Sequence, residues 1–282
     1  MKFSLLLSTG LFATSIVAAP RGRGLAHRVA SRTSRTGLPA QILDPLDRIL
    51  AGQDGNATHV SYSNNWSGAV LTAPPAGTTF SAVSGKFAVP VPSTPKGGPD
   101  ASHSASIWAG IDGDTFQNSI LQAGIDVTVT KSGAAEAVTY SAWYEWYPNY
   151  AINIASTAFS FKEKDVISIS ITSSSSTKGT IVLSNINTGK SFSKTLEAPS
   201  AAAALGGQNA EWIVEDYSQN GALVPFANFG TVHFSECVAK AGTTNVGTKG
   251  AEIINLKVKD TGKVLTDVTI PSESEVHVVY TA

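Results

Sequence analysis

From residue 61 onward, apolar and polar residues alternate in short runs that turn residues separate. In residues 166–172, for example, Ile167, Ile169 and Ile171 fall on one face, opposite serine and threonine, which is the period-two pattern of a half-buried strand. The Asn187-Thr-Gly189 sequence between two such runs indicates a hairpin. Further runs lie near 66–72, 80–89, 105–112, 118–129, 137–147, 210–217, 230–236, 251–259, 263–270 and 274–280. About a dozen strands at this spacing predict a single all-β antiparallel sandwich or barrel.

Few segments depart from this pattern. Ala198–Leu205 is the one stretch that could form a short helix, and Ser173–Thr177 is interpreted as a loop. Asp260-Thr-Gly262 matches the triplet of pepsin-like aspartic proteases, but those enzymes need two such loops in apolar surroundings. Here there is one, between lysines, so a β-turn is the better interpretation.

The first residues have the pattern of a secretory signal. Lys2 precedes an apolar run from Phe3 to Val17, which ends in Ala18-Ala19. The run is shorter than the ~20 residues that a transmembrane helix needs. We therefore expect residues 1–19 to be a signal peptide, and the protein to be secreted and not held in a membrane.

Charge divides the rest of the chain into two parts. All six arginines lie before residue 49, whereas residues 61–282 hold thirteen lysines against eighteen acidic residues, a net charge of −5. A body without clustered cations argues against nucleic acid as a partner. We interpret residues 20–60 as a basic propeptide, held partly by charge, with a flexible tail as the alternative, and residues 61–282 as the catalytic domain. Asn56 starts a glycosylation sequon, and Asn65 starts a second one of lower weight because Trp66 follows it.

Cysteine and metal chemistry contribute little. Cys237 is the single cysteine, so no intramolecular disulfide can form, and the core must supply the stability. The sequence contains no HExxH, P-loop, paired CxxC or GxSxG motif. His233 and His277 alternate with apolar residues and are expected on a solvated face. We expect no metal and no cofactor.

Four segments combine acidic or amide residues with aromatic residues or glycine on one predicted face. These segments are 106–115, 118–126, 139–148 and 209–217. Strand parity groups Trp108, Gly110 and Asp112; Gln122, Gly124 and Asp126; Ser141, Trp143, Glu145 and Tyr147; and Glu211, Ile213, Glu215 and Tyr217. If the four faces align, they form a concave surface with hydrogen-bonding groups and stacking rings, as in a binding groove.

These segments, together with SNNWSGAVL (63–71) and FAVP (87–90), resemble the eqolisin family of fungal glutamic peptidases. The resemblance runs from about Tyr62 to the end of the chain. It implies a concanavalin-like sandwich of two roughly seven-stranded antiparallel sheets, an acid endopeptidase activity insensitive to pepsin-type inhibitors, and a monomer that acts on peptides and carries its own propeptide. It implies a catalytic dyad of Gln122 and Glu215, with Glu215 and not Glu211 as the glutamate. It also implies substrate-binding roles for Trp66, Gly68, Trp108, Asp112, Trp143 and Glu145.

The implied dyad is chemically sufficient for peptide hydrolysis. Glu215 can take a proton from water and return it to the leaving amine, while the Gln122 amide can orient the water and stabilise the oxyanion. An amide does not titrate, so such a pair can work at acidic pH, where a histidine base would be protonated.

Two departures from the family and two alternatives remain open. Ser141 stands where the family often has aspartate, and Phe116 where it often has cysteine. A glycoside hydrolase using Glu145 and Glu215 is one alternative, for which carboxyls ~5–5.5 Å apart would indicate a retaining mechanism. A non-catalytic lectin with an aromatic groove is the other.

Overall fold

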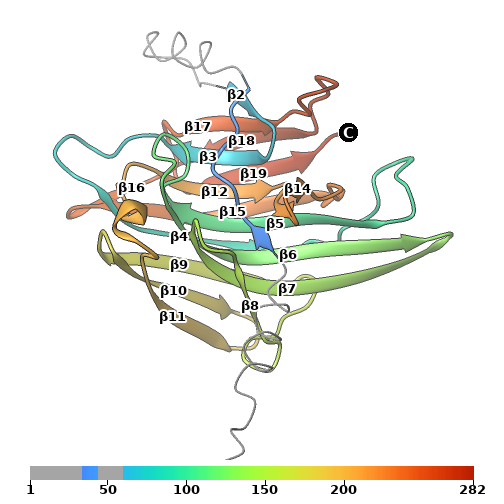
Figure 1. Ribbon diagram of the computed structural model, residues 1–282, viewed down its shortest axis with the longest axis horizontal. Helices are drawn as coiled ribbons and strands as arrows, with labels where there is room; N and C mark the ends of the chain where they lie inside the picture. The colour runs from blue at the N-terminus through green and yellow to red at the C-terminus, as the bar shows by residue number, and fades with distance from the viewer. Residues whose placement is uncertain (1–33, 44–59) are drawn as a thin grey trace, which may run out of the picture. The chain divides into compact units, whose positions relative to one another are not determined.

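The computed structural model describes residues 34–43 and 60–282. The predicted signal peptide, most of the basic leader and Asn56 lie outside the described residues. Two eight-stranded sheets account for most of the described chain, and a small three-stranded sheet adds to them (Figure 1). The all-β sandwich expected from the sequence is therefore confirmed.

The first sheet has the strand order β2-β17-β3-β12-β5-β6-β7-β8. Its strands are β2 (Val60–Ser63), β17 (Glu252–Leu256), β3 (Trp66–Leu71), β12 (Ala210–Glu215), β5 (Ser102–Ile111), β6 (Ile120–Ser132), β7 (Ala135–Tyr147) and β8 (Ile152–Ile154). All pairs are antiparallel except β2 with β17, which is parallel. The far ends of β6 and β7 extend beyond the rest of the sheet (Figure 1).

The second sheet has the order β11-β10-β9-β4-β15-β19-β18, with β16 paired to β15. Its strands are β4 (Phe80–Ala88), β9 (Val166–Ser175), β10 (Lys178–Asn185), β11 (Ser191–Glu197), β15 (Thr231–Ala241), β16 (Thr244–Val246), β18 (Thr266–Ser272) and β19 (Glu275–Tyr280). The predicted hairpin at Asn187-Thr-Gly189 joins β10 and β11. His233 and His277 lie opposite each other on β15 and β19 and stack ring on ring.

Two short elements differ from expectation. The predicted loop at Ser173–Thr177 is wrong for its first three residues, because β9 continues to Ser175 and pairs with β10 through an irregularity at Lys178 and Gly179. The possible helix at Ala198–Leu205 is a single 3-10 turn, η1 (Ala201–Ala203).

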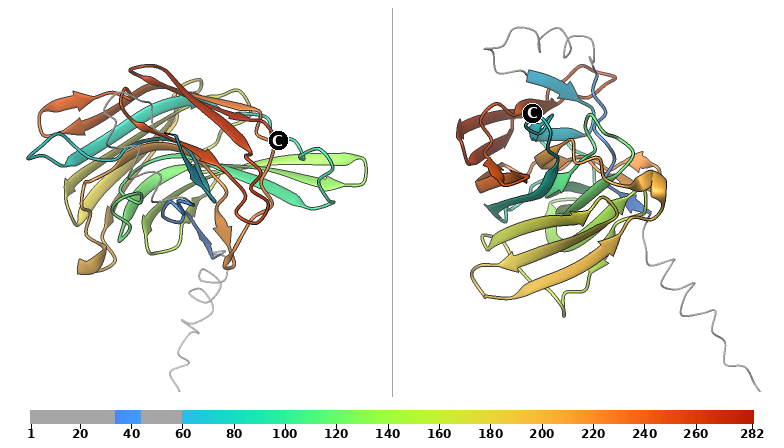
Figure 2. Two further views of the ribbon diagram at one scale, coloured as in Figure 1. Left: turned by 90° about the horizontal axis from the view of Figure 1, so that it is seen from above. Right: turned by 90° about the vertical axis from the view of Figure 1, so that its left-hand side faces the viewer.

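The two faces of the first sheet have different roles. One face packs against the second sheet, where Ile167, Ile169 and Ile171 are buried as predicted and the Trp212 indole nitrogen donates to the Ser84 carbonyl at 2.8 Å. The opposite face carries a second buried cluster that includes Trp108 and Trp143. Residues 34–43, in blue in Figure 2, contact this second cluster, because Ala40 belongs to it and Ile42 packs against it. Their first residues form β1 (Arg35–Thr36), which pairs with β13 (Ser218–Gln219), itself paired with β14 (Ala222–Leu223).

Gly124 permits the close packing of this second face. A Cβ built at Gly124 would lie 2.2 Å from the Ile107 carbonyl oxygen and 2.5 Å from the Trp108 Cβ. We predict that Gly124→Ala destabilises the fold by about 3 kcal/mol, because the neighbouring strand must move to admit the methyl group.

The control is Gly133→Ala, at a turn where a Cβ would meet nothing within 4 Å and where only the positive φ of 60° opposes the change. It should cost about 1 kcal/mol. Equal midpoints of chemical denaturation for the two variants would contradict this explanation.

Candidate active site

The register of four adjacent strands places the predicted polar residues in rows across one face of the first sheet. Gly110 on β5 lies opposite both Glu211 on β12 and Gln122 on β6, and Gln122 lies opposite Glu145 on β7. Gly110 has no side chain to separate its neighbours in this row. The four predicted faces therefore align, and they form the floor of one site.

Two further rows follow at the two-residue spacing of a strand. One contains Ile213, Trp108, Gly124 and Trp143. The next begins with Glu215, which lies opposite Ser106, and Ser106 lies opposite Asp126. Ser141, the first departure from the family pattern, continues this row opposite Asp126.

The Gln122 side chain lies in the middle of the floor and is fully buried. Its Nε2 donates to Glu145 Oε2 at 3.2 Å. Its Oε1 has no hydrogen-bond partner among the described residues. The amide is thus held by one contact and keeps its acceptor oxygen available.

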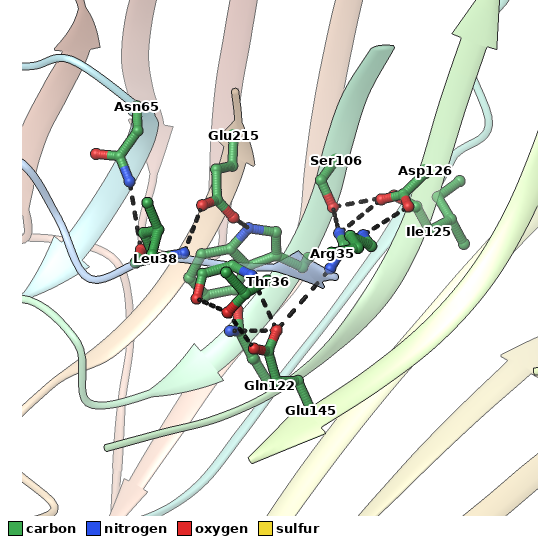
Figure 3. Close-up of polar contacts among 12 residues, drawn as sticks. Arg35, Thr36, Leu38, Asn65, Ser106, Gln122, Ile125, Asp126, Glu145 and Glu215 are labelled. Atoms are coloured by element: carbon green, nitrogen blue, oxygen red, sulfur yellow. Dashed lines mark hydrogen bonds and ion pairs between the residues drawn. The ribbon is translucent and has the colours of Figure 1, made fainter. Parts of the chain in front are cut away.

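Both carboxyl oxygens of Glu215 accept hydrogen bonds. The Trp108 indole nitrogen donates to Oε2 at 3.0 Å, and the main-chain nitrogen of Leu38 donates to Oε1 at 2.9 Å (Figure 3). Burial raises the pKa of Glu215 to about 8, against an opposing effect from Arg35 and these donors. In this arrangement the group is protonated at acidic pH.

Residues 34–43 of the basic leader run along the floor and contact its acidic groups. The Arg35 guanidinium makes a two-pronged contact with Asp126, at 2.8 and 2.7 Å, and donates to Ser106 Oγ at 2.8 Å (Figure 3). It also contacts the rings of Trp143 and Tyr217, with its central carbon 3.9 and 4.4 Å from the two centroids. A planar cation held by a carboxylate and two aromatic faces is a specific pocket for arginine.

The next two residues contact Glu145. Thr36 Oγ1 and the Gly37 main-chain nitrogen donate to its two oxygens at 2.7 and 3.0 Å. Burial raises the pKa of Glu145 to about 7, partly offset by Arg35. A Cβ built at Gly37 would lie 2.6 Å from Gln122 Nε2, so the chain passes directly against the Gln122 amide.

The remaining described residues of the leader run along β3 and the loop after β5. The Trp66 indole nitrogen donates to the Leu38 carbonyl at 2.8 Å. The main-chain nitrogen of Ala40 donates to the Gly113 carbonyl, and Gln117 Nε2 donates to the Ala40 carbonyl. An extended peptide can therefore be bound along the whole floor.

The predicted site residues fall into two groups. Trp66, Trp108, Trp143 and Glu145 contact either the leader segment or the Glu215 carboxyl. Gly68 and Asp112 support the surrounding structure; their role as substrate contacts stays a prediction.

The contacts of Gly68 and Asp112 show what each supports. A Cβ at Gly68 would lie 2.0 Å from the Trp212 carbonyl oxygen, so glycine is required for strand packing there. Asp112, at a positive φ of 71°, accepts hydrogen bonds from the main-chain nitrogens of residues 206–209 and fixes that loop.

The second glutamate of the same strand, Glu211, has different surroundings. It is fully buried, and neither of its carboxyl oxygens has a hydrogen-bond partner among the described residues. Burial, with Asp112 and Asp114 nearby, raises its pKa well above the ordinary value. Glu211 does not contact the leader through a hydrogen bond, whereas Glu215 does, which favours Glu215 as the reactive group.

Sequence reasoning missed two contributors. Arg35 was grouped only with the other basic residues of the leader, because nothing in its local sequence indicates a buried partner. Asn65 was considered only as a sequon, but it is fully buried and hydrogen-bonded to the leader. The described residues contain no group of three or more His, Cys, Asp or Glu side chains that could hold a metal. Nor does that part of the chain contain a helix long and apolar enough to span a membrane.

The fold and the site define a β-sandwich protein with a peptide-binding floor of buried carboxyl and amide groups. The profile of the Peptidase A4 family matches residues 64–280. Aspergillopepsin-2 of Aspergillus niger is 34% identical over 294 residues, which cover 97% of this chain and 98% of the relative. Scytalidopepsin B of Scytalidium lignicola is 36% identical over 270 residues, covering 92% and 93%.

Solved structures agree with these matches. A scytalido-glutamic peptidase bound to a transition state analog inhibitor has a TM-score of 0.65 at 33% identity, covering 77% of this chain and 98% of that one. Aspergilloglutamic peptidase from Aspergillus niger has a TM-score of 0.57 at 36% identity, covering 64% and 99%. The chain belongs to the Peptidase A4, or eqolisin, family and is a glutamic-type endopeptidase; the glycosidase alternative is not favoured.

The raised pKa values of Glu145 and Glu215 predict how the stability of the full-length chain depends on pH. The folded chain keeps protons that the unfolded chain releases above the ordinary carboxyl pKa of 4.5. The stabilisation is therefore fully present below about pH 4.5 and is lost as the pH rises through about 7 and 8. Between these pH values the free energy of unfolding should fall by up to about 1.4 kcal/mol per pH unit for each carboxyl.

The measurement is denaturant unfolding of the full-length Gln122→Ala chain between pH 5 and 8, a variant that lacks one of the two residues expected to be catalytic. Adding Glu215→Gln should flatten the slope, whereas adding Glu163→Gln at an exposed position should not. If Glu215→Gln leaves the pH dependence of the free energy of unfolding unchanged, the raised pKa of Glu215 is contradicted.

Proposed function

We propose that this peptidase hydrolyses peptide bonds with Glu215 as general base and then general acid, and with Gln122 as the group that holds the water and the oxyanion. The observation that carries the proposal is the position of one main-chain amide. The Leu38 nitrogen is 2.9 Å from Glu215 Oε1, and the adjoining Gly37 passes against the Gln122 amide. The Gly37–Leu38 bond therefore marks where a substrate bond would lie.

The chemistry follows from these positions. An ionised Glu215 removes a proton from water, and the resulting hydroxide forms a bond to the carbonyl carbon of the substrate. The negative charge moves to the carbonyl oxygen, where Gln122 Nε2 donates a hydrogen bond to it. Glu215 then gives the proton to the nitrogen in the place of the Leu38 nitrogen, the carbon–nitrogen bond breaks, and the amine leaves.

Neighbouring residues keep the two groups in place. The Trp108 indole donates to the Glu215 oxygen that faces away from Leu38, so the other oxygen stays directed at the reacting bond. Glu145 accepts both from Gln122 Nε2 and from the main-chain nitrogen of Gly37, and so aligns the amide with the peptide. Trp66 and Trp143 bind the chain on either side of the bond.

We further propose that residues 34–43 are the inhibitory part of the propeptide of a secreted precursor. They fill the floor in the place of a substrate, and in this closed arrangement burial raises the pKa of Glu215 to about 8, so that the proposed general base is protonated at acidic pH. The buried Arg35 contact with Asp126 supplies the charge attraction that the basic leader and acidic body suggest. The signal-like residues 1–19 support export.

The dyad is tested in the purified, matured enzyme with a peptide substrate at acidic pH. Glu215→Gln and Gln122→Ala should each lower kcat by at least about a thousandfold, because each removes a group that acts on the reacting atoms. Glu211→Gln, on the same strand, should keep most of the activity if it folds. Substantial activity in either dyad variant, with an unchanged circular dichroism spectrum, would refute the dyad.

The inhibitory segment is tested with a synthetic peptide of residues 34–43 added to the matured enzyme. The peptide should inhibit competitively, and Arg35→Ala in the peptide should weaken inhibition by at least about thirtyfold, because Asp126 is left buried without its cation. A peptide of the same composition in reversed order is the control. Equal inhibition by all three peptides would contradict the proposed binding mode.

A further inference from the structure

We infer that Asn65 is a main-chain clamp that binds the leaving side of the substrate, out to the fourth residue after the cleaved bond. The inference rests on the proposed function, because it takes the Gly37–Leu38 bond as the position of cleavage. Leu38 then corresponds to the first residue after the bond, and Gln41 to the fourth.

The Asn65 side chain contacts three main-chain groups of the segment. Its Nδ2 donates to the Leu38 carbonyl at 3.3 Å and to the Pro39 carbonyl at 3.2 Å, and its Oδ1 accepts from the Gln41 main-chain nitrogen at 2.8 Å (Figure 3 shows Asn65 beside Leu38). The amide faces carbonyls with its nitrogen and an N–H group with its oxygen. Reversing the amide would oppose like groups, so these partners fix its orientation.

The side chain is held ready for this role. Ser63 Oγ donates to Asn65 Oδ1 at 2.9 Å, and the same hydroxyl accepts from the main-chain nitrogens of Asn65 and Trp66. Asn65 is fully buried, and its own carbonyl accepts from the main-chain nitrogen of Asp216 at 2.8 Å. Asp216 directly follows Glu215, so the clamp is tied to the strand that carries the proposed catalytic carboxyl.

The neighbouring main chain extends the contact. The Asn64 nitrogen donates to the Gln41 carbonyl at 3.0 Å, and the Leu43 nitrogen donates to the Tyr62 carbonyl at 2.9 Å. The segment after the marked bond therefore pairs with residues 62–65 much as an added strand does.

All these contacts are with main-chain atoms of the segment. The clamp should therefore bind many sequences equally, unlike the Arg35 pocket, which contacts a side chain. Proline as the second residue is compatible, since only its carbonyl is used. A side chain buried and bonded in this way has no room for a carbohydrate, so the Asn65 sequon should stay unmodified in the folded protein.

The test combines an enzyme variant with a single-atom change in the substrate. The enzyme, matured from the full chain, is compared with Asn65→Ala on a peptide that has at least five residues after its cleaved bond. A second substrate replaces the amide nitrogen of the fourth residue with an ester oxygen. In the wild type this change should lower kcat/KM about tenfold, the effect of one lost hydrogen bond. In Asn65→Ala the same change should have no further effect.

A second variant adds a signature that a merely structural residue would not give. Asn65→Asp can donate and accept while its carboxyl is protonated, so it should approach wild-type kcat/KM at low pH. It should lose activity on the peptide as the carboxyl ionises and faces two carbonyl oxygens. The ester effect in the wild-type enzyme can be measured even if neither Asn65 variant folds.

The outcomes separate the two hypotheses. Esters are therefore placed in turn at the third, fourth and fifth residues. An equal effect at the fourth residue in the wild type and Asn65→Ala, or no effect at any of the three in the wild type, overturns the clamp while leaving the dyad intact. If instead the ester has its effect at the third or fifth residue, the bond lies elsewhere, and the assignment of Gly37–Leu38 in the proposed function is wrong. If Glu215→Gln remains active, the dyad fails whatever the ester result.

Discussion

Carboxyl groups buried on one side of a sheet need hydrogen-bond donors, and this need organises the site. Asp126, Glu145 and Glu215 are all buried on the face of the sheet that carries the Gln122 amide. The sheet itself supplies few donors to them, chiefly the Trp108 indole and the Gln122 amide. The leader segment supplies the rest with a guanidinium, a hydroxyl and two main-chain N–H groups. The same donors that satisfy the carboxyls also define how an extended peptide binds.

This arrangement has a consequence for activation. Burial raises the pKa values of Glu145 and Glu215 while Arg35 and the other donors of the segment lower them, and burial has the larger effect, so the occupied site takes up protons as the pH falls. In the proposed activation, cutting the chain or losing the Arg35 contact with Asp126 removes the segment and exposes Glu215 to water, where it can ionise.

Much of the fold could be predicted from the sequence, because each strand has a clear two-residue alternation. Parity alone placed Gln122, Glu145 and Glu215 on faces that the structure then aligns. The rows themselves could not be predicted, because the strand order β12-β5-β6-β7 depends on long-range pairing. Ser173–Ser175 was missed because a run of serines has no apolar alternation, although the pairing with β10 still extends through it.

The contributions of Arg35, Asn65 and Asp112 lay outside what sequence patterns can indicate. Arg35 is one of six arginines in the leader, and nothing in the sequence distinguishes it from the others. Only the structure shows that its guanidinium is buried against Asp126. Asp112 continues the face of Trp108 by parity, but its left-handed backbone turns its carboxylate towards the amides of residues 206–209. The alternation of apolar and polar residues predicts regular strands well, but it does not predict the contacts of residues just beyond the strand ends.

The central claim is that the segment controls Glu215 by covering it. The most direct measurement is a carbon-13 NMR titration of labelled glutamate carboxyls, with Glu215 assigned through Glu215→Gln. It compares the Gln122→Ala precursor with the Gln122→Ala domain lacking residues 1–59. The claim predicts a pKa of about 8 for Glu215 in the precursor and a value shifted towards the ordinary 4.5 when the segment is absent. The same pKa in both proteins would contradict it.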